Sequence, residues 1–286
     1  MKHGVKVGIL AIASAATLIA CSDGDDERGT PRREIAPPAP AEELGPARYE
    51  VIDIGDAGSI AGSVRWAGPL PELAMLPVRA HREVCGDEQP SEALSVGAGG
   101  GVAGAVIWVR DARRGAALEI PDEPVTIRLE GCRYRPHVLA VAAGTALRFQ
   151  SADSVLHNVH GLRDGSTVWD FALPDRGDSL IVTVDEPGIV RLVSDIHSFA
   201  QGWVHAFAHP YFAVSDAEGR FRIAGVPPGQ YVVRVWHEGW RVVGTEAGRP
   251  KYSSPIILSR TISVSERQEI TTDFELNRES GEIAGD

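Results

Sequence analysis

Apolar side chains alternate with polar ones in short runs along most of this chain, and this alternation constrains the fold more than any other feature. Such alternation places one face of a β-strand in a core and the other face in solvent. Gly, Pro, Asp or Ser separate the runs, and convincing helical periodicity is absent after the N-terminal segment. The sequence therefore predicts an all-β protein built from β-sandwiches. The clearest runs contain Ile60, Val64, Trp66, Val125, Ile127, Leu129, Leu180, Val182, Val184, Tyr231, Val233, Val235, Ile270, Phe274 and Leu276.

The spacing of these runs divides the chain into two predicted domains. We expect a first β-sandwich over residues 51–207 and a second, smaller one over residues 208–277, followed by a tail over residues 278–286. The segment from Gly58 to Glu130 leaves two alternatives open. It could add strands to the first sandwich, or it could form a small sandwich of its own.

The N-terminus has the layout of a secretory signal. A short basic stretch ending at Lys6 precedes an apolar run from Val7 to Ile19. The run leads into a Leu-Ile-Ala-Cys motif that is similar to a bacterial lipobox, so residues 1–20 are predicted to be a lipoprotein signal peptide and Cys21 to carry lipid. The alternative is an ordinary signal peptide that contains the cysteine by accident.

Residues 21–50 are polar, acidic and proline-bearing, and are predicted to form a flexible tether behind the lipid anchor. This predicts a lipid-anchored protein of the bacterial cell envelope, in the periplasm or at the cell surface, with the membrane as a partner. Ser22 favours the outer membrane, because it replaces the aspartate that retains some lipoproteins at the inner membrane.

Cysteine usage predicts one disulfide. If Cys21 carries lipid, Cys85 and Cys132 remain as an even pair in an oxidising compartment, where pairing is the default. The bond would close a loop of about 47 residues and contribute roughly 3–4 kcal/mol by restricting the unfolded chain.

Two histidine motifs lie next to predicted strands. One is His157-Asn-Val-His160, and the other is Ser194-Asp-Ile-His197-Ser-Phe-Ala200. In the second motif the residues at positions 194, 197 and 200 recur at three-residue intervals after a strand.

The region from about Val125 to Phe207 resembles the cupredoxin family, whose fold is a Greek-key β-sandwich with a copper site at one end. The two histidine motifs carry most of this resemblance. The runs Cys132–Val138 and Ala143–Phe149 look like the family's opening strands, and Ser151-Ala152-Asp153 takes the place of its Asn-x-Asp turn.

The resemblance implies a copper site that has lost its sulfur ligands. Ser194 stands at the thiolate position and Ala200 at the thioether position, whereas His157 and His197 keep the two imidazoles. A blue-copper centre requires the thiolate. The site is therefore degenerate, with no cofactor required and copper as the one candidate.

The candidate metal ligands are His157 and His197, with His160 as a third. An extended strand would place His160 on the opposite face from His157, so a turn is needed. Asp195 could orient an imidazole from behind. Two alternatives remain: a relic pocket of hydrogen-bonded histidines, or replacement of the missing thiolate by one of the two later cysteines.

The C-terminal region resembles a carboxypeptidase regulatory-like module with a prealbumin-type sandwich. The runs His209–Phe221 and Gly225–Tyr231 carry this resemblance. Such modules are often grouped with carbohydrate-binding-like folds, so Trp236 and Trp240 are candidates for stacking on a sugar ring. The alternative is that these indoles pack in the core or between domains. Together, the two resemblances are to bacterial envelope proteins that join such domains.

Several functions are excluded by the remaining patterns. A net charge of −11 argues against nucleic acid as a partner. Ser194 and Asp195 cannot converge on one imidazole, because consecutive strand residues face opposite sides. A Gly-x-Ser-x-Gly elbow is absent, and the acidic residues are scattered rather than paired. The glycine-rich run 97–104 lacks the lysine of a phosphate-binding loop.

The sequence thus predicts a non-enzymatic, envelope-anchored binding or adaptor lipoprotein with a degenerate cupredoxin site that binds Cu(II) through histidines. Carbohydrate or cell-wall binding through the C-terminal module is the first alternative. Copper electron transfer, with a ligand supplied by a partner, is the second. The predicted partners beyond the membrane are a glycan or an envelope protein.

Overall fold

The computed structural model describes Met1 and residues 48–282, and over this range the protein is nearly all β-structure, as predicted. The predicted signal peptide, the acylated Cys21 and the tether up to residue 47 lie outside the described residues. Residues 48–282 belong to one compact unit and contain 25 strands and two short helices. Within this range, neither helix has the length and apolar character needed to cross a membrane.

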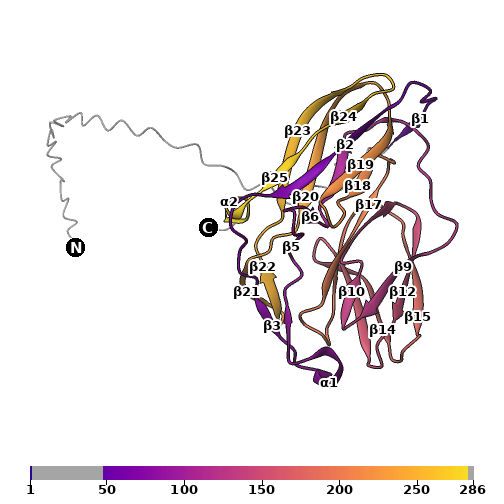
Figure 1. The fold of residues 1–286 in the computed structure, drawn as a ribbon. Helices are drawn as coiled ribbons and strands as arrows, with labels where there is room; N and C mark the ends of the chain where they lie inside the picture. The colour runs from indigo at the N-terminus through magenta and orange to yellow at the C-terminus, as the bar shows by residue number, and fades with distance from the viewer. Residues whose placement is uncertain (2–47, 283–286) are drawn as a thin grey trace, which may run out of the picture. The chain divides into compact units, whose positions relative to one another are not determined.

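Residues 125–207 form a two-sheet sandwich, which we call the inserted sandwich (Figure 1). One sheet has the strand order β10-β9-β12-β15, and the other has the order β11-β17-β16-β13-β14. The pairs β9–β12 and β11–β17 are parallel, and the remaining pairs are antiparallel. The strand bounds are β9 Val125–Glu130, β10 Arg133–Arg135, β11 Val138–Ala142, β12 Thr145–Ser151, β13 His157–Arg163, β14 Ser166–Leu173, β15 Ser179–Val184, β16 Gly188–Val193 and β17 Gln201–Phe207.

The core of the inserted sandwich follows from the period-two pattern. In β12 every second side chain from Thr145 to Ser151 is buried. Leu147 and Phe149 of this strand meet Val159 and Val190 of the opposite sheet in one apolar cluster. Burying these faces against each other stabilises the sandwich and fixes the strand ends that carry the histidine motifs.

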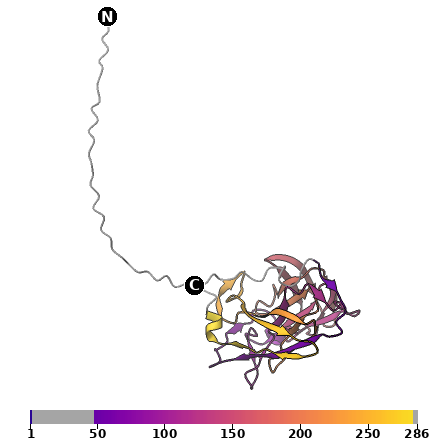
Figure 2. The same ribbon diagram turned by 90° about the horizontal axis from the view of Figure 1, so that it is seen from above.

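A second sandwich, which we call the framing sandwich, is built from chain segments on both sides of the inserted one. Its sheets have the orders β18-β7-β20-β23 and β19-β2-β24, and β25 also pairs with β2. Figure 2 shows the purple N-terminal strand beside the yellow C-terminal strands, where β2 pairs in parallel with β24 and β25. The strand bounds are β2 Gly58–Trp66, β7 Val106–Arg110, β18 Phe212–Val214, β19 Arg220–Val226, β20 Gly229–His237, β23 Ile256–Val264, β24 Glu269–Thr271 and β25 Phe274–Leu276.

This arrangement differs from the predicted division at residues 207 and 208. Strands β2 and β7, which were expected in the first domain, pair with C-terminal strands. Within Gly58–Glu130, β9 joins the inserted sandwich as the first alternative states, but β2 and β7 do not. The reason is packing, because Ile60 and Ile107 lie in the same apolar core as Val233 and Val235. Residues 208–277 therefore do not form a sandwich without the earlier strands.

The remaining elements are short. Residues 67–105, which we call the connecting segment, place Leu76, Val78 and Cys85 in the inserted core and Leu94 and Val102 in the framing core. The predicted tail begins with a short helix rather than a frayed end. The bounds are β1 Glu50–Val51, β3 Met75–Pro77, α1 Arg82–Cys85, β4 Glu88–Pro90, β5 Ser95–Val96, β6 Val102–Ala103, β8 Arg114–Gly115, β21 Val242–Glu246, β22 Arg249–Tyr252 and α2 Arg278–Glu282.

Aromatic packing joins the two sandwiches. Trp108 of β7, Phe207 of β17 and Trp236 of β20 belong to one buried cluster together with Val106 and Val138. Trp108 lies 6.1 Å from Phe207 between ring centroids. The junction is therefore a continuous apolar core, which holds the inserted sandwich firmly on the framing one.

Candidate metal site

His157 and His197 come together at one end of the inserted sandwich. His157 is the first residue of β13, and His197 lies in the loop between β16 and β17. Their ring centroids are 5.1 Å apart, and each residue is only 1% exposed. The ends of neighbouring strands therefore bring these two imidazoles into one buried group.

A third imidazole, from His81, joins this pair. His81 Nδ1 lies 3.0 Å from His197 Nε2, within hydrogen-bonding distance. His81 is the N-cap of α1 and has a left-handed backbone with φ of 54°, which is uncommon for a non-glycine residue. No histidine motif in the sequence indicated His81, although it lies four residues before Cys85. The predicted disulfide to Cys132 would have carried this turn to the same end of the sandwich.

Asp153 holds the ring of His157 in one orientation. His157 Nε2 lies 3.1 Å from Asp153 Oδ2 and donates to it. The same carboxylate accepts hydrogen bonds from the backbone N–H groups of Gly131 at 3.0 Å and Cys132 at 2.8 Å. An ionised carboxylate only accepts, so the proton of the neutral ring is on Nε2 and the lone pair is on Nδ1.

The ring of His197 has one nitrogen that the protein leaves unused. The bond to His81 holds a single proton between the two rings. The Nδ1 atom of His197 is buried, and it has no hydrogen-bond partner among the described residues. When Nε2 donates to His81, Nδ1 carries a lone pair that a cation would satisfy. On this observation, the residues present fit a transition-metal ion.

Burial keeps the two rings neutral. Desolvation, assisted by the neighbouring rings of His157 and His81, lowers the pKa of His197 to about 4. Desolvation also lowers the pKa of His157, and this effect outweighs the attraction of Asp153 for the charged form. Metals bind the neutral imidazole, so these histidines do not have to lose protons near pH 7 before they bind.

Ser194 and Ala200, which stand where a blue-copper loop would carry sulfur, make hydrogen bonds within their own loop. Ser194 Oγ accepts hydrogen bonds from the backbone N–H groups of His197 at 3.0 Å and Ile196 at 3.3 Å. Ala200 is buried, and its N–H donates to the carbonyl of His197 at 2.8 Å. Neither residue has a sulfur atom, and a serine hydroxyl is not ionised near neutral pH, so the loop lacks the soft ligands of a blue-copper centre.

The structure does not bring His160 to this group. Strand β13 continues through His160 without the turn that ligation would need, so its ring lies on the opposite face. His160 Nδ1 lies 3.2 Å from Asp195 Oδ2, and Nε2 lies 2.8 Å from Thr167 Oγ1. Asp195 also pairs with Arg249 of β22. Asp195 therefore supports His160 rather than either imidazole of the buried pair.

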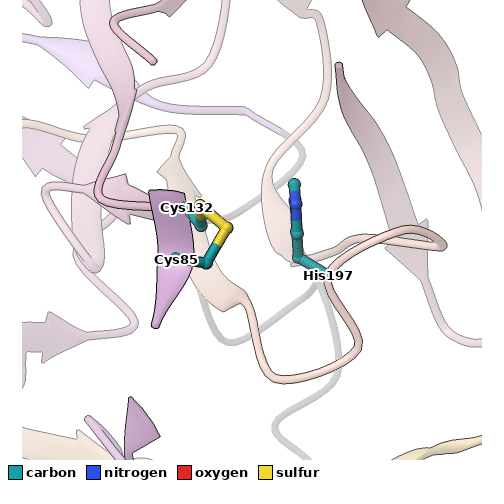
Figure 3. A group of neighbouring side chains, drawn as sticks. All are labelled: Cys85, Cys132 and His197. Atoms are coloured by element: carbon teal, nitrogen blue, oxygen red, sulfur yellow. A yellow bond between two sulfur atoms is a disulfide. The ribbon is translucent and has the colours of Figure 1, made fainter. Parts of the chain in front are cut away.

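The predicted Cys85–Cys132 disulfide is present, with 5.7 Å between the Cα atoms. Figure 3 shows the ring of His197 standing beside it. The ligand atoms of Cys85, Cys132 and His197 all lie within 4.8 Å of one another. Sulfurs bonded to each other are not thiolates, so neither cysteine replaces the missing copper thiolate in this oxidised state.

The two candidate sugar-binding tryptophans are buried. Trp236 is 1% exposed and Trp240 is 2% exposed. Trp236 packs edge-on against Trp203, and Trp240 packs edge-on against Trp66, each with 5.1 Å between ring centroids. Neither indole has a free face on which a sugar could stack. The prediction that these residues bind carbohydrate is thus not supported, and the packing alternative describes both.

A second polar group lies where the sandwiches meet. The carboxylate of Glu238, just after β20, pairs with His137 and accepts from Gln201 Nε2 at 2.7 Å and Trp203 Nε1 at 2.9 Å. Burial alone raises the pKa of Glu238, but its interactions with His137 and Trp203 outweigh burial and hold the pKa below its ordinary value. A cavity of about 540 Å³ borders Glu238, His137 and His237. The group bridges the two sandwiches through an ion pair in which Glu238 is buried and His137 is partly buried.

Comparisons with known proteins give a likeness to copper proteins in fold. Neither a protein-family model nor a curated protein matches the chain. Among solved structures, it is similar to the Cu-containing nitrite reductase of Thermus scotoductus SA-01, with a TM-score of 0.27, 21% identity, and coverage of 32% of this chain and 25% of that one. It is also similar to amicyanin from Paracoccus versutus, with a TM-score of 0.28, 18% identity and coverage of 31% and 85%. A purple cupredoxin from Nitrosopumilus maritimus is also similar, with a TM-score of 0.26, 22% identity, and coverage of 29% of this chain and 98% of that one.

The structural neighbours are thus cupredoxins, and each covers about a third of this chain or less. The chain spans only a quarter of the length of the nitrite reductase. At these identities and TM-scores the likeness concerns fold alone. The histidine group is a candidate metal site because of the geometry of His81, His157 and His197, not because of this likeness.

Proposed function

We propose that this chain is a non-enzymatic copper-binding protein of the bacterial envelope, which holds Cu(II) through His157 and His197. The observation that supports this most strongly is the convergence of two buried, neutral imidazoles whose Nε2 atoms are already engaged by Asp153 and His81. This arrangement leaves the two Nδ1 atoms as the candidate ligand atoms, and we propose that both bind the ion.

Copper is favoured over other divalent ions by the donor set. Imidazole suits several transition metals, and affinity along the first row is highest for Cu(II). A structural zinc site usually has four protein ligands in a closed shell. The group of His81, His157 and His197 offers fewer, and its loop lacks the thiolate of a blue-copper centre. We therefore propose that the protein binds or delivers copper rather than transferring electrons.

Location in the envelope is part of the same proposal. It is supported by the predicted lipobox at Cys21 and by the Cys85–Cys132 disulfide, a bond that persists in oxidising compartments. A partner that receives or supplies copper would be another envelope protein. The glycan alternative has less support, because Trp236 and Trp240 are buried.

Calorimetric titration of the oxidised full chain with Cu(II) tests the proposal. We expect one-to-one binding in the wild type and a loss of affinity in His157→Ala and in His197→Ala. Loss of a supporting residue commonly costs roughly 10–100-fold in metal affinity, so loss of a ligand should cost more than about 100-fold. His160→Ala is the matched control and should bind like the wild type. Equal binding by wild type, His157→Ala and His197→Ala would refute the proposal.

A further inference from the structure

We propose that reduction of the Cys85–Cys132 disulfide creates a second state of the metal site, in which the two cysteine sulfurs and His197 bind Cu(I). This inference deepens the proposed function and rests on it for the role of His197 as a ligand. It adds two residues that stand outside the histidine motifs and a different oxidation state of the ion.

The geometry of the three residues is the first argument. Their ligand atoms lie within 4.8 Å of one another, and Figure 3 shows the disulfide and the ring of His197 side by side. Sulfur and nitrogen atoms bound to one ion at roughly 2.0–2.3 Å stand roughly 3.5–4 Å apart. Small side-chain movements are therefore enough to place all three on one cation after the S–S bond is broken.

The backbone around both cysteines is held independently of the disulfide. The N–H of Cys85 donates to the carbonyl of His81 at 2.8 Å, so one turn carries both a sulfur and an imidazole. The N–H of Cys132 donates to Asp153 at 2.8 Å, and the same carboxylate orients His157. These bonds keep the two sulfurs beside the histidines when the covalent link is absent.

The donor atoms that the site offers depend on the state of the disulfide. Thiolates select soft cations such as Cu(I), whereas imidazoles alone suit Cu(II). The loop offers no sulfur at Ser194 or Ala200, but Cys85 and Cys132 offer two sulfurs from the connecting segment and the β9–β10 turn. The oxidised protein thus presents nitrogen to Cu(II), and the reduced protein presents sulfur to Cu(I). The same place can hold copper through a change of oxidation state.

The redox step requires a dithiol reductant. One thiolate of the reductant attacks a cysteine sulfur, the S–S bond breaks and a mixed disulfide forms. The second thiolate of the reductant then displaces the cysteine and closes the reductant's own disulfide. In sum, two electrons and two protons pass from the dithiol to Cys85 and Cys132. Binding of Cu(I) by both thiols releases these two protons to solvent.

The approach to the disulfide lies on the side of α1. Cys85 and Cys132 are 2% and 1% exposed, but Cys85 is the one buried residue of this four-residue helix. Val84 is 42% exposed, and the side chain of Arg82 is 62% exposed. Only a short, solvent-facing turn has to move for a reductant to reach the sulfurs.

The experiment compares reduced wild type with the Cys85→Ser, Cys132→Ser double variant, using the full chain without oxygen. The two proteins are matched, because both lack the disulfide. They differ only at residues 85 and 132, where the wild type carries thiols and the variant carries hydroxyls. Each competes for Cu(I) with a soluble Cu(I) chelator. We expect the reduced wild type to bind Cu(I) at least roughly 100-fold more tightly than the double variant. Loss of a supporting residue costs up to roughly 100-fold in metal affinity, and loss of two ligands should cost at least as much. X-ray absorption of the Cu(I)-loaded wild type should show copper–sulfur scattering, a readout that needs no variant.

Equal Cu(I) affinity of the two proteins, or copper bound without sulfur neighbours, would overturn the inference. So would thiols that become titratable only when denaturant unfolds the chain. Cu(II) titration of the oxidised wild type separates this inference from the proposed function. Failure there, with Cu(I)–sulfur binding intact, would refute the imidazole site and leave the thiolate site standing.

Discussion

Two groups of buried histidines in this molecule share the same burial but differ in their use. His157 and His197 lie at the end of the inserted sandwich, whereas His205 and His209 lie at the junction of the two sandwiches. Each of the four is at most 1% exposed, and burial lowers the pKa of each ring. By exposure and basicity alone, the two groups could not be told apart.

The hydrogen bonds separate them. Neither ring nitrogen of His205 has a partner among the described residues, and its ring packs edge-on against Trp236 with 4.4 Å between centroids. His209 Nδ1 accepts from the N–H of Tyr211 at 3.1 Å, and its Nε2 has no such partner. These two imidazoles act as aromatic packing groups within an apolar junction.

The two groups therefore differ in how their rings are oriented. In the metal-site group, Asp153 and His81 engage one nitrogen of each ring, the ring centroids of His157 and His197 lie 5.1 Å apart, and His197 lies beside the disulfide. At the junction, no carboxylate of residues 48–282 engages a ring nitrogen of His205 or His209. The orientation of the imidazoles, rather than their burial, is the basis on which we propose metal binding at His157 and His197.

The largest effect expected on this comparison comes from removing the disulfide. The Cys85→Ser, Cys132→Ser variant should lose about 4 kcal/mol of unfolding free energy, because the bond restricts a loop of 47 residues in the unfolded chain. Urea denaturation measures it, and reduced wild type should lose a similar amount. A loss below about 1 kcal/mol would show that the link contributes little. The junction histidines should keep their NMR chemical shifts.

A substitution at the junction of the two sandwiches should lower the unfolding free energy slightly less than removal of the disulfide. Glu238→Gln removes the negative charge opposite His137, and breaking a buried ion pair costs roughly 3–5 kcal/mol. Because glutamine keeps one acceptor oxygen, we expect about 3 kcal/mol in urea denaturation, at the lower end of that range. The affinity for Cu(II) should not change. A large loss of Cu(II) binding would contradict the separation of the two groups.

The junction histidines predict acid sensitivity. Burial lowers the pKa of His205 to about 3, whereas the unfolded residue has a pKa of about 6.5. The unfolded state therefore takes up the proton first, so the stabilisation is complete above pH 6.5 and is lost as the pH falls toward the folded pKa. Between pH 7 and pH 5 this amounts to about 2 kcal/mol for one histidine. His205→Leu should reduce the change in unfolding free energy between pH 7 and pH 5 by this amount. A pH profile that is the same in the variant and the wild type would show that His205 does not cause the acid sensitivity.

The smallest effect is expected at His160. His160→Ala removes contacts with Asp195 and Thr167 on the outer face of β13, and such partly exposed contacts are worth about 0.5 kcal/mol. Thermal unfolding should shift only slightly, and Cu(II) affinity should stay the same. A marked loss of copper binding in this variant would place His160 in the site after all.

Much of the fold could be predicted from sequence, because period-two alternation reports burial on one face of a strand. Alternation does not say which core a strand joins. The apolar face of β2, with Ile60 and Val64, fits either sandwich, and only its pairing with β24 and β25 decides. The indoles of Trp236 and Trp240 pose a similar problem, since a tryptophan beside a turn can be exposed or buried.

Part of the candidate site could also be predicted from the sequence. The resemblance placed His157 and His197 at one end of a sandwich, and cysteine pairing gave the disulfide. His81 lies 116 residues before His197, and in the sequence only the predicted disulfide indicated that its segment lies near the site. The carboxylate of Asp153 acquires its role from three donors that meet only in the folded chain.

Pulsed EPR of the Cu(II)-loaded, oxidised full chain tests the central claim most directly, because it counts the imidazoles bound to copper. We expect coupling to two histidine rings, with one lost in His157→Ala, one lost in His197→Ala and none lost in His160→Ala. The spectrum should also lack the signature of a thiolate ligand. Copper coupled to no imidazole, or coupling unchanged in both His157→Ala and His197→Ala, would contradict the claim.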